Sequence, residues 1–282
     1  MKRDWGKLPD FANPPVQEVA IAVSFDSLAL FRNAHFGLFW SRIRDKYPCF
    51  EEHEPIKSAY ENLEAIRPGG PDSSFRLDIT LRKDPPVPRV WFLNESGNVL
   101  VQVQQNRFIH NWRRMDLEEP YPRYKVVFER FCQDISEFEK FIVSEGLGSV
   151  SINHCEVTYV NVIPSSDVWE RHGQWDRMLT ILRHEYSDNW LSEPEGFNLG
   201  IAYLIPDDLG NPLGRLHVKA EPINNAETGI PGCRLVLTAR GLPEGDGLKG
   251  ALKFIERGHE WIVRSFASLT TEQMHEEWGR NE

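Results

Sequence analysis

The sequence of 282 residues contains no long apolar run. No segment approaches the roughly 18 consecutive apolar residues that a membrane-spanning helix needs. The basic residues between Met1 and Lys7 are not followed by an apolar stretch, so the start of the chain does not resemble a secretory signal. We therefore expect a cytoplasmic protein with no membrane partner.

Cysteine is also scarce. The four cysteines, Cys49, Cys132, Cys155 and Cys233, are far apart and show no C-x-x-C spacing. This pattern predicts reduced, mostly buried thiols and excludes a disulfide framework or a zinc site of the usual spacing. The sequence also lacks an H-E-x-x-H helix, a nucleophile elbow and a phosphate-binding loop with its lysine. We expect no metal, no cofactor and no catalytic residue.

Positive charge is in deficit, with 32 basic against 42 acidic residues and a net charge of -10. A protein whose whole surface binds nucleic acid is excluded by this balance, although a local basic face is compatible with it. Hydrophobic residues make up 40% of the chain and nine tryptophans are present, which is enough for a substantial core. The length allows one large domain or two ordinary ones.

Two long apolar stripes at helical spacing organise the chain. The stretch from Tyr121 to Gly146 predicts a helix, with Pro122 in its first turn and Gly146 just beyond its end. The first stripe contains Tyr124, Phe128, Phe131, Ile135, Phe138 and Ile142. The second stripe, near the C-terminus, contains Leu248, Leu252, Ile255, His259, Ile262 and Phe266. The same steps in both stripes suggest two copies of one structural unit.

Alternating segments predict strands around these helices. Before the first long helix we expect strands over Val19–Phe25, Phe75–Arg82, Arg89–Asn94, Val99–Gln105 and Phe108–Arg113, with a helix over Phe36–Tyr47 and a linking segment over Glu51–Pro71. Before the second long helix we expect strands over Val150–Ile163, Phe197–Ile205, Leu213–Glu221 and Cys233–Arg240 and a helix over Asp176–Tyr186. After it we expect a short helix over Thr271–Trp278.

This element order predicts an α+β protein made of two pseudo-repeats, residues 1–148 and 149–282, packed as one body. Each half reads as strand, helix, antiparallel strands and long helix. The order resembles the TATA-binding-protein-like folds, in which a curved antiparallel sheet carries helices on one side. A single long sheet of helix-grip connectivity is the alternative. The similarity concerns element order, and fold similarity alone transfers no function.

Several short motifs point to a particular family. The matching residues are Asn13-Pro14-Pro15-Val16 with Glu18-Val19, Gly37 with Trp40, Trp91-Phe92-Leu93-Asn94, Phe108 with Asn111-Trp112, Tyr121-Pro122-Arg123-Tyr124, Asn153 with Cys155-Glu156-Val157-Thr158-Tyr159 and Asn161, and Thr270 with Trp278-Gly279. By these motifs the chain resembles a family of sporadically distributed bacterial and archaeal proteins of about this length. No activity is established for that family, so the resemblance implies no catalytic residue.

A polar face is the strongest functional signal. If the apolar residues of each strand face the helices, the opposite face collects Arg76, Asp78, Thr80, Arg82, His154, Glu156, Arg215, His217, Lys219, Glu221, Arg234 and Arg240. With histidine neutral, this set has six basic and three acidic residues, a local charge of +3 on a chain of -10. Such a face suits an anionic ligand or an acidic protein surface, although charges that protect sheet edges explain part of it.

We therefore expect a non-catalytic binding protein that uses the open face of the sheet to hold a protein partner or an anionic ligand. The predicted binding residues are Arg76, Arg82, Asn111, Trp112, Arg113, His154, Glu156, Arg215, His217, Lys219, Arg234 and Arg240. One alternative is an enzyme with a site between the halves at His154 and Glu156. A second is single-stranded nucleic-acid binding through Phe108, Trp112 and neighbouring arginines. The sequence leaves the oligomeric state open.

One further motif, Gly245-x-Gly247-x-x-Gly250, has the spacing of a dinucleotide-binding turn. That turn belongs to a parallel βαβ unit, whereas the neighbouring strands here look antiparallel and Leu248 already belongs to the helical stripe. We interpret the glycines as a loop that leads into a helix.

Overall fold

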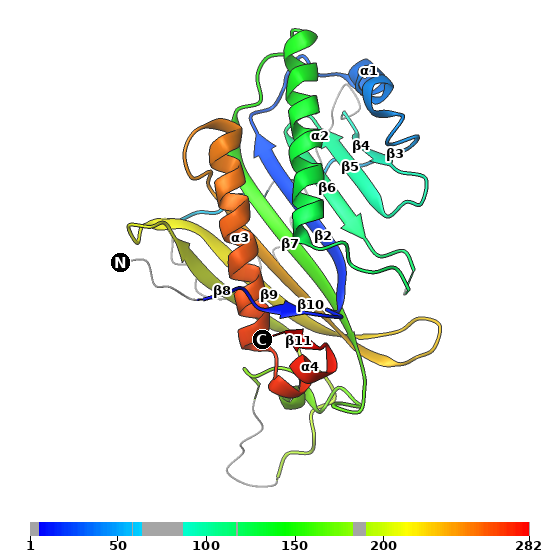
Figure 1. Cartoon of the computed structure of the whole chain (residues 1–282), viewed down its shortest axis with the longest axis vertical. Coiled ribbons are helices and arrows are strands. Elements are labelled where there is room, and N and C mark those ends of the chain that lie inside the picture. The colour runs from blue at the N-terminus through cyan, green and yellow to red at the C-terminus, as the bar shows by residue number, and fades with distance from the viewer. Residues whose placement is uncertain (1–5, 58, 64–86, 117, 183–189, 282) are drawn as a thin grey trace.

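The computed structural model of the chain describes residues 6–57, 59–63, 87–116, 118–182 and 190–281. These residues form a mixed α+β structure with one large sheet in which every strand pairing is antiparallel (Figure 1). In spatial order the described strands are β3 (Cys49–His53), β4 (Arg89–Leu93), β5 (Val99–Gln104), β6 (Arg107–Arg113), β2 (Val16–Phe25), β7 (Ile152–Pro164), β10 (Pro231–Gly241), β9 (Pro212–Asn224) and β8 (Leu199–Pro206).

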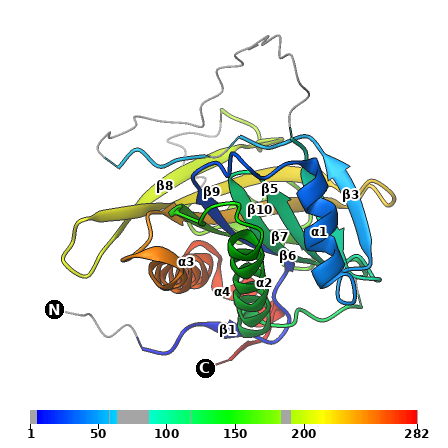
Figure 2. The same cartoon turned by 90° about the horizontal axis from the view of Figure 1, so that it is seen from above.

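Two long helices cover one face of this sheet. They are α2 (Tyr124–Ser144) and α3 (Gly247–Leu269). The helices lie side by side, with α2 over β6 and β2 and α3 over β7 and β10 (Figures 1 and 2). Two shorter helices, α1 (Asn33–Ile43) and α4 (Glu272–Glu277), complete the helical structure of the described residues together with the 3₁₀ turn Trp175–Arg177. The prediction of a large antiparallel sheet with helices is confirmed.

The central strand β7 shows why the core lies on the helix side. Cys155, Val157 and Tyr159 are buried beneath the helices, while His154 and Glu156 alternate with them on the other face. Successive side chains of a strand point to opposite faces, so the alternation in the sequence assigns each residue to a face. The distribution predicted for this strand is confirmed.

The ends of α2 follow from its flanking residues. Gly146 has a φ of +67°, and the amides of Gly146 and Leu147 donate to the carbonyl oxygens of Val143 and Ile142. This is the Schellman arrangement, which satisfies the last carbonyls of a helix, as the position of Gly146 predicted. The helix starts later than expected. Arg123 has a φ of +73° and directly precedes it, so Pro122 lies outside the first turn.

Other predictions need correction. Within residues 176–182 the structure has a 3₁₀ turn and irregular backbone in place of the predicted helix, because that segment is tied by the 2.9 Å bond from Thr180 N to Leu269 O and the 3.1 Å bond from Thr271 N to Met178 O. The expected linking segment begins with a strand, β3, which has no buried face and hence no alternating pattern. The predicted strand Phe75–Arg82 lies outside the described residues.

Both ends of the described chain meet on the helix side. The short strands β1 (Asp10–Phe11) and β11 (Arg280–Asn281) pair with each other. The amide of Ala12 donates to Gly279 O over 2.8 Å, and that of Asn13 donates to Trp278 O over 3.0 Å. The Phe11 ring packs at 5.6 Å from Phe266 of α3. The N-terminal segment thereby crosses α3 and passes the N-terminal end of α2, where Arg123 donates to Phe11 O over 2.8 Å (Figure 1).

Candidate functional site

The structure brings most of the predicted binding residues to the sheet face opposite the helices. Strand register places them there, since residues paired across a sheet share a face: Glu156 is opposite Arg240, which is opposite Arg215. The predicted residues on this face are Asn111, Arg113, His154, Glu156, Arg215, His217, Lys219, Arg234 and Arg240. Arg76 and Arg82 lie outside the described residues.

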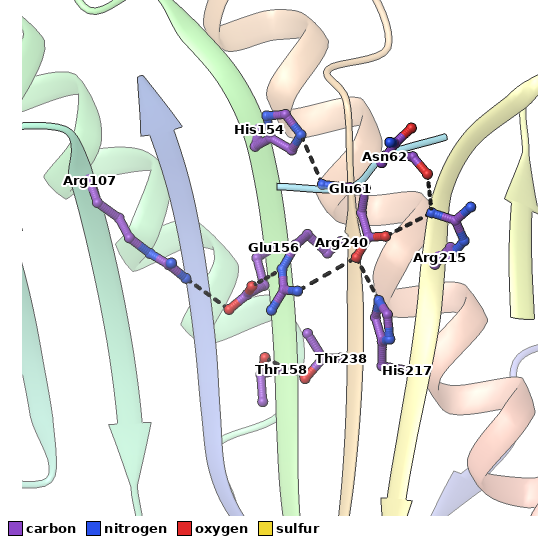
Figure 3. Close-up of polar contacts among 10 residues, drawn as sticks. All are labelled: Glu61, Asn62, Arg107, His154, Glu156, Thr158, Arg215, His217, Thr238 and Arg240. Carbon is purple, nitrogen blue, oxygen red and sulfur yellow. Dashed lines mark hydrogen bonds and ion pairs between the residues drawn. The ribbon is translucent and has the colours of Figure 1, made fainter. Parts of the chain in front are cut away.

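At the centre of this face is a residue that the sequence analysis did not select, Glu61. Its Oε2 lies 3.0 Å from Nη1 of Arg215, and its Oε1 lies 2.6 Å from Nε2 of His217 and 3.5 Å from Nη1 of Arg240 (Figure 3). Arg215 also donates to the carbonyl oxygen of Asn62 over 2.8 Å. We call Glu61, Arg215, His217 and Arg240 the Glu61 cluster. Three basic side chains thus surround one carboxylate.

The electrostatics of the cluster keep this carboxylate ionised. The Glu61 side chain is only 7% exposed, and burial alone would raise its pKa. Hydrogen bonds from His217 and Arg215 and the positive charge of Arg240 outweigh burial and lower the pKa of Glu61 to about 2. The cluster therefore binds a negative charge at neutral pH.

Glu156 forms a second bridge on the same face. Its Oε1 lies 2.9 Å from Nη2 of Arg107 and its Oε2 lies 2.5 Å from Nε of Arg240 (Figure 3). The Arg107 bridge crosses β2, where Ala22 is opposite Glu156 and leaves room above the sheet. The two arginines lower the pKa of Glu156 in spite of its burial. A carboxylate held ionised in this way is a weak base, so the geometry gives little support to an enzyme centred on His154 and Glu156.

His154 holds the backbone next to Glu61. Its Nε2 accepts a hydrogen bond from the Glu61 amide over 3.3 Å, and the edge of the Tyr60 ring packs against its imidazole at 4.7 Å. Burial lowers the pKa of His154, which favours the neutral ring that can accept this bond. His154 is therefore a positioning residue for the segment that carries Glu61.

The segment 54–63 lies across the face that the sequence analysis expected to be open. Figure 2 shows it on the side of the sheet turned away from α2 and α3. Ile56 exchanges two hydrogen bonds with the Gln104 side chain, at 3.2 and 3.0 Å, and Arg89 donates to Glu54 O over 3.3 Å. The part of this face around Gln104, His154 and Arg215 is thus covered by the chain itself. This covering was not predictable, because Glu61 is one acidic residue among several in an irregular stretch of the sequence.

A row of polar side chains continues the face across the N-terminal strands. Arg89 on β4 donates to Gln102 on β5 over 2.5 Å, and Gln102 donates to Asn111 on β6 over 2.8 Å. Asn111 donates in turn to Glu18 on β2 over 2.5 Å. All three bonds join neighbouring strands through buried or half-buried groups, which suits a rigid surface more than a catalytic centre.

The remaining predicted residues have separate places. Arg113 donates to Gly97 O over 2.9 Å and lies 5.6 Å from the Trp91 ring. Arg234 forms an ion pair with Glu221, and Lys219 is exposed. Trp112 and Phe108 lie on the helix side, where they are 2% and 0% exposed. Their rings pack in the core, so stacking on nucleic-acid bases from the sheet face is not open to them.

The glycine motif has a structural explanation. Gly245 and Gly247 have φ values of +107° and +56° in the loop before α3. A Cβ at Gly250 would lie 2.1 Å from Gly245 O, so a side chain does not fit where the loop closes on the first helical turn. The following helix leads from an antiparallel strand, β10. These observations agree with the interpretation of the motif as a loop into a helix.

Comparison with protein-family models, with curated proteins and with solved structures gave no match. In the part of the chain that the structure describes, none of the helices is long and apolar enough to cross a membrane.

Proposed function

We propose that the protein is a non-catalytic binding protein whose sheet face, at the Glu61 cluster, receives a carboxylate of an acidic protein partner. In this proposal Glu61 occupies the position that the partner's carboxylate takes in the complex. A small anionic ligand at the same position is the other outcome that the test below distinguishes.

The observation that carries the proposal is the number of basic groups around one carboxylate. Arg215, His217 and Arg240 all lie within 3.5 Å of Glu61. Counting Arg107, Arg215 and Arg240 against Glu61 and Glu156 gives three positive and two negative charges, so the site has an excess of one positive charge with His217 neutral. Charge-assisted hydrogen bonds of this kind select carboxylates.

The structure of the segment that carries Glu61 supports its displacement by a partner carboxylate. The described residues of this segment, 54–57 and 59–63, contain no helix or strand, and side chains of Gln104, His154, Arg215 and His217 bond to them. A segment without its own backbone ladder opens at a lower free-energy cost than a strand of the sheet. A partner carboxylate needs to displace only this segment.

The proposal also includes a duplicated architecture. Going outward from the central pair β2 and β7, the N-terminal half has the order β2, β6, β5, β4, β3 and the C-terminal half has β7, β10, β9, β8. In each half the first strand lies beside the last, and a long helix follows the last strand. This correspondence supports two related halves, 1–148 and 149–282, as in the TATA-binding-protein-like folds. In the Glu61 cluster the three basic side chains come from the second half and Glu61 comes from the first.

A competition experiment tests the proposed function. Fluorescence anisotropy of a labelled oligoglutamate peptide measures capture of an acidic surface by the wild type and by Glu61→Gln. We expect the variant to bind roughly tenfold more tightly, because the internal carboxylate no longer competes for Arg215 and His217. Affinity should fall as salt rises. Displacement of the peptide by a low concentration of citrate, a small anion, would favour a small anionic ligand over an acidic protein partner.

Two further variants test whether a gain in affinity arises at the Glu61 cluster. Arg215→Glu in the Glu61→Gln background should abolish the gain in affinity, because it places a negative charge within the cluster. Glu221→Gln, which removes a carboxylate from the exposed pair with Arg234, is the matched control and should leave affinity nearly unchanged. Equal binding by the wild type and Glu61→Gln would refute the proposal.

A further inference from the structure

A cavity on the helix side of the sheet is separate from the Glu61 cluster. It has a volume of about 430 Å³ and lies between the N-terminal segment, the start of α2, the middle of α3 and strand β7. Its walls are mainly apolar and aromatic, with Leu8, Phe11, Val16, Ile262, Val263 and Phe266 among them. Cavities of this size and lining are typical of sites for small organic molecules.

Three polar side chains meet in this apolar surrounding. The hydroxyl oxygens of Tyr121 and Tyr159 are 3.2 Å apart, and the Tyr159 hydroxyl lies 3.0 Å from Nδ1 of His259. The Tyr124 ring stacks on the imidazole of His259 at 3.5 Å with the planes 8° apart. These contacts fix the orientation of His259. The only side-chain hydrogen bond of His259 to the described residues uses Nδ1, and His259 is one of the residues that line the cavity.

The protonation states of the three groups indicate the charge of a suitable ligand. Burial lowers the pKa of His259 to about 4, raises that of Tyr121 to about 12 and raises that of Tyr159 well above its ordinary value, so all three are neutral at pH 7. The basic side chains at the rim are engaged elsewhere: Arg123 donates to Phe11 O over 2.8 Å, and Lys125 is 86% exposed beside Glu129. A charged group inside would have no counter-charge, which is costly.

Backbone strain marks the same place. Arg123, at the rim, has φ +73° and ψ 149°, a combination that residues other than glycine rarely adopt. In this conformation its guanidinium reaches the carbonyls of Phe11 and Ala12 and ties the N-terminal wall of the cavity to the start of α2. Strain of this kind persists where the surrounding structure holds it, and it is concentrated at ligand sites.

We propose that this cavity binds a small, uncharged, mostly apolar molecule that carries one hydrogen-bonding group, such as a ketone or a hydroxyl, directed at Nε2 of His259. The apolar walls supply most of the affinity, and the single polar contact orients the molecule. The site is independent of the Glu61 cluster, which lies on the opposite face of the sheet.

Prodan, an uncharged naphthalene ketone with polarity-sensitive emission, is a suitable probe. We expect saturable binding to the wild type with blue-shifted fluorescence. His259→Phe keeps an aromatic ring against Tyr124 but removes the nitrogen, and should weaken prodan binding roughly tenfold. Val263→Trp should fill the cavity and abolish binding. Val143→Trp, at a 68% exposed position on α2, is the control and should bind as the wild type does.

Several outcomes would overturn the proposal. They are an absence of saturable prodan binding to the wild type, or unchanged binding in both His259→Phe and Val263→Trp. Displacement of prodan by an anionic naphthalene sulfonate at equal concentration would contradict an uncharged ligand. Circular dichroism establishes that each variant is folded. If Val263→Trp does not fold, Val263→Phe fills less of the cavity and gives the same comparison.

Discussion

Two buried carboxylates lie on opposite faces of the same sheet, and each is held by a histidine and a basic side chain. On the helix side, Asp134 of α2 contacts Nδ1 of His110 at 2.8 Å, the Tyr47 hydroxyl at 2.6 Å and Nζ of Lys46 at 2.7 Å. On the other face, Glu61 contacts His217 and Arg215 at 2.6 and 3.0 Å. The local chemistry of the two sites is similar.

The two carboxylates belong to different kinds of structural element. Asp134 is part of a long helix whose backbone is fixed by its own hydrogen bonds, and His110, on β6, is fully buried beneath it. Glu61 belongs to an irregular segment that crosses the sheet. Removing Asp134 from its partners requires α2 to leave the sheet, whereas removing Glu61 requires only the movement of a short segment. From this difference we expect Asp134 to secure the fold, and we expect Glu61 to be the carboxylate that a partner can displace.

The largest effect is expected from Asp134→Ala. This substitution leaves the buried groups of His110 and Tyr47 without their acceptor, and we expect a loss of about 3–5 kcal/mol in the free energy of unfolding. Urea unfolding followed by circular dichroism measures it. Glu137→Ala on the same helix, whose partner Lys140 is mostly exposed, is the control and should change stability by less than about 0.5 kcal/mol. Comparable losses of unfolding free energy in both variants would contradict a special role of Asp134 in the fold.

A smaller effect is expected from Glu61→Gln. The amide keeps the shape of the side chain and loses the charge-assisted bonds, so we expect a loss of about 1.5–3 kcal/mol in urea unfolding. Hydrogen exchange should show faster exchange in residues 54–63 and unchanged protection in β7 and β10. Loss of protection throughout the sheet would mean that Glu61, like Asp134, secures the fold.

The pH dependence of stability separates the two faces further. Because the pKa of Glu61 falls from its ordinary 4.5 to about 2 in the folded state, its contribution is present above pH 4.5 and is lost as the pH falls toward 2. Urea midpoints at pH 5 and pH 3 should therefore differ less for Glu61→Gln than for the wild type. An identical difference in the two proteins would show that this carboxylate titrates normally.

The smallest effect concerns His259, whose hydrogen-bond partner among the described residues is the Tyr159 hydroxyl and not a carboxylate. Burial lowers its pKa to about 4, so between pH 6.5 and pH 4 the unfolded chain binds a proton that the folded chain does not, and stability falls as the pH falls through this range. His259→Phe should remove this part of the acid sensitivity. NMR titration of the imidazole gives the pKa directly, and a value near 6.5 would contradict the neutral cavity proposed above.

Part of the candidate site was predictable because it depends on strand alternation. The period of two along Val150–Ile163 and Leu213–Glu221 placed His154, Glu156, Arg215 and His217 on one face, as the structure does. Trp112 was assigned to the binding residues by composition, although its alternation with Asn111 already pointed to the opposite face. Glu61 was missed because its partner Arg215 is 154 residues away in the chain.

By itself the sequence determined the two long helices, most of the strands and the face of each strand that is buried, because these depend on side-chain period and on short-range signals such as Gly146. The tertiary structure decided what covers each face. The path of residues 54–63 over the sheet and the meeting of the N-terminal segment with α2 and α3 at the cavity are contacts between distant parts of the chain. Such contacts leave no periodic pattern, since they depend on where whole elements pack.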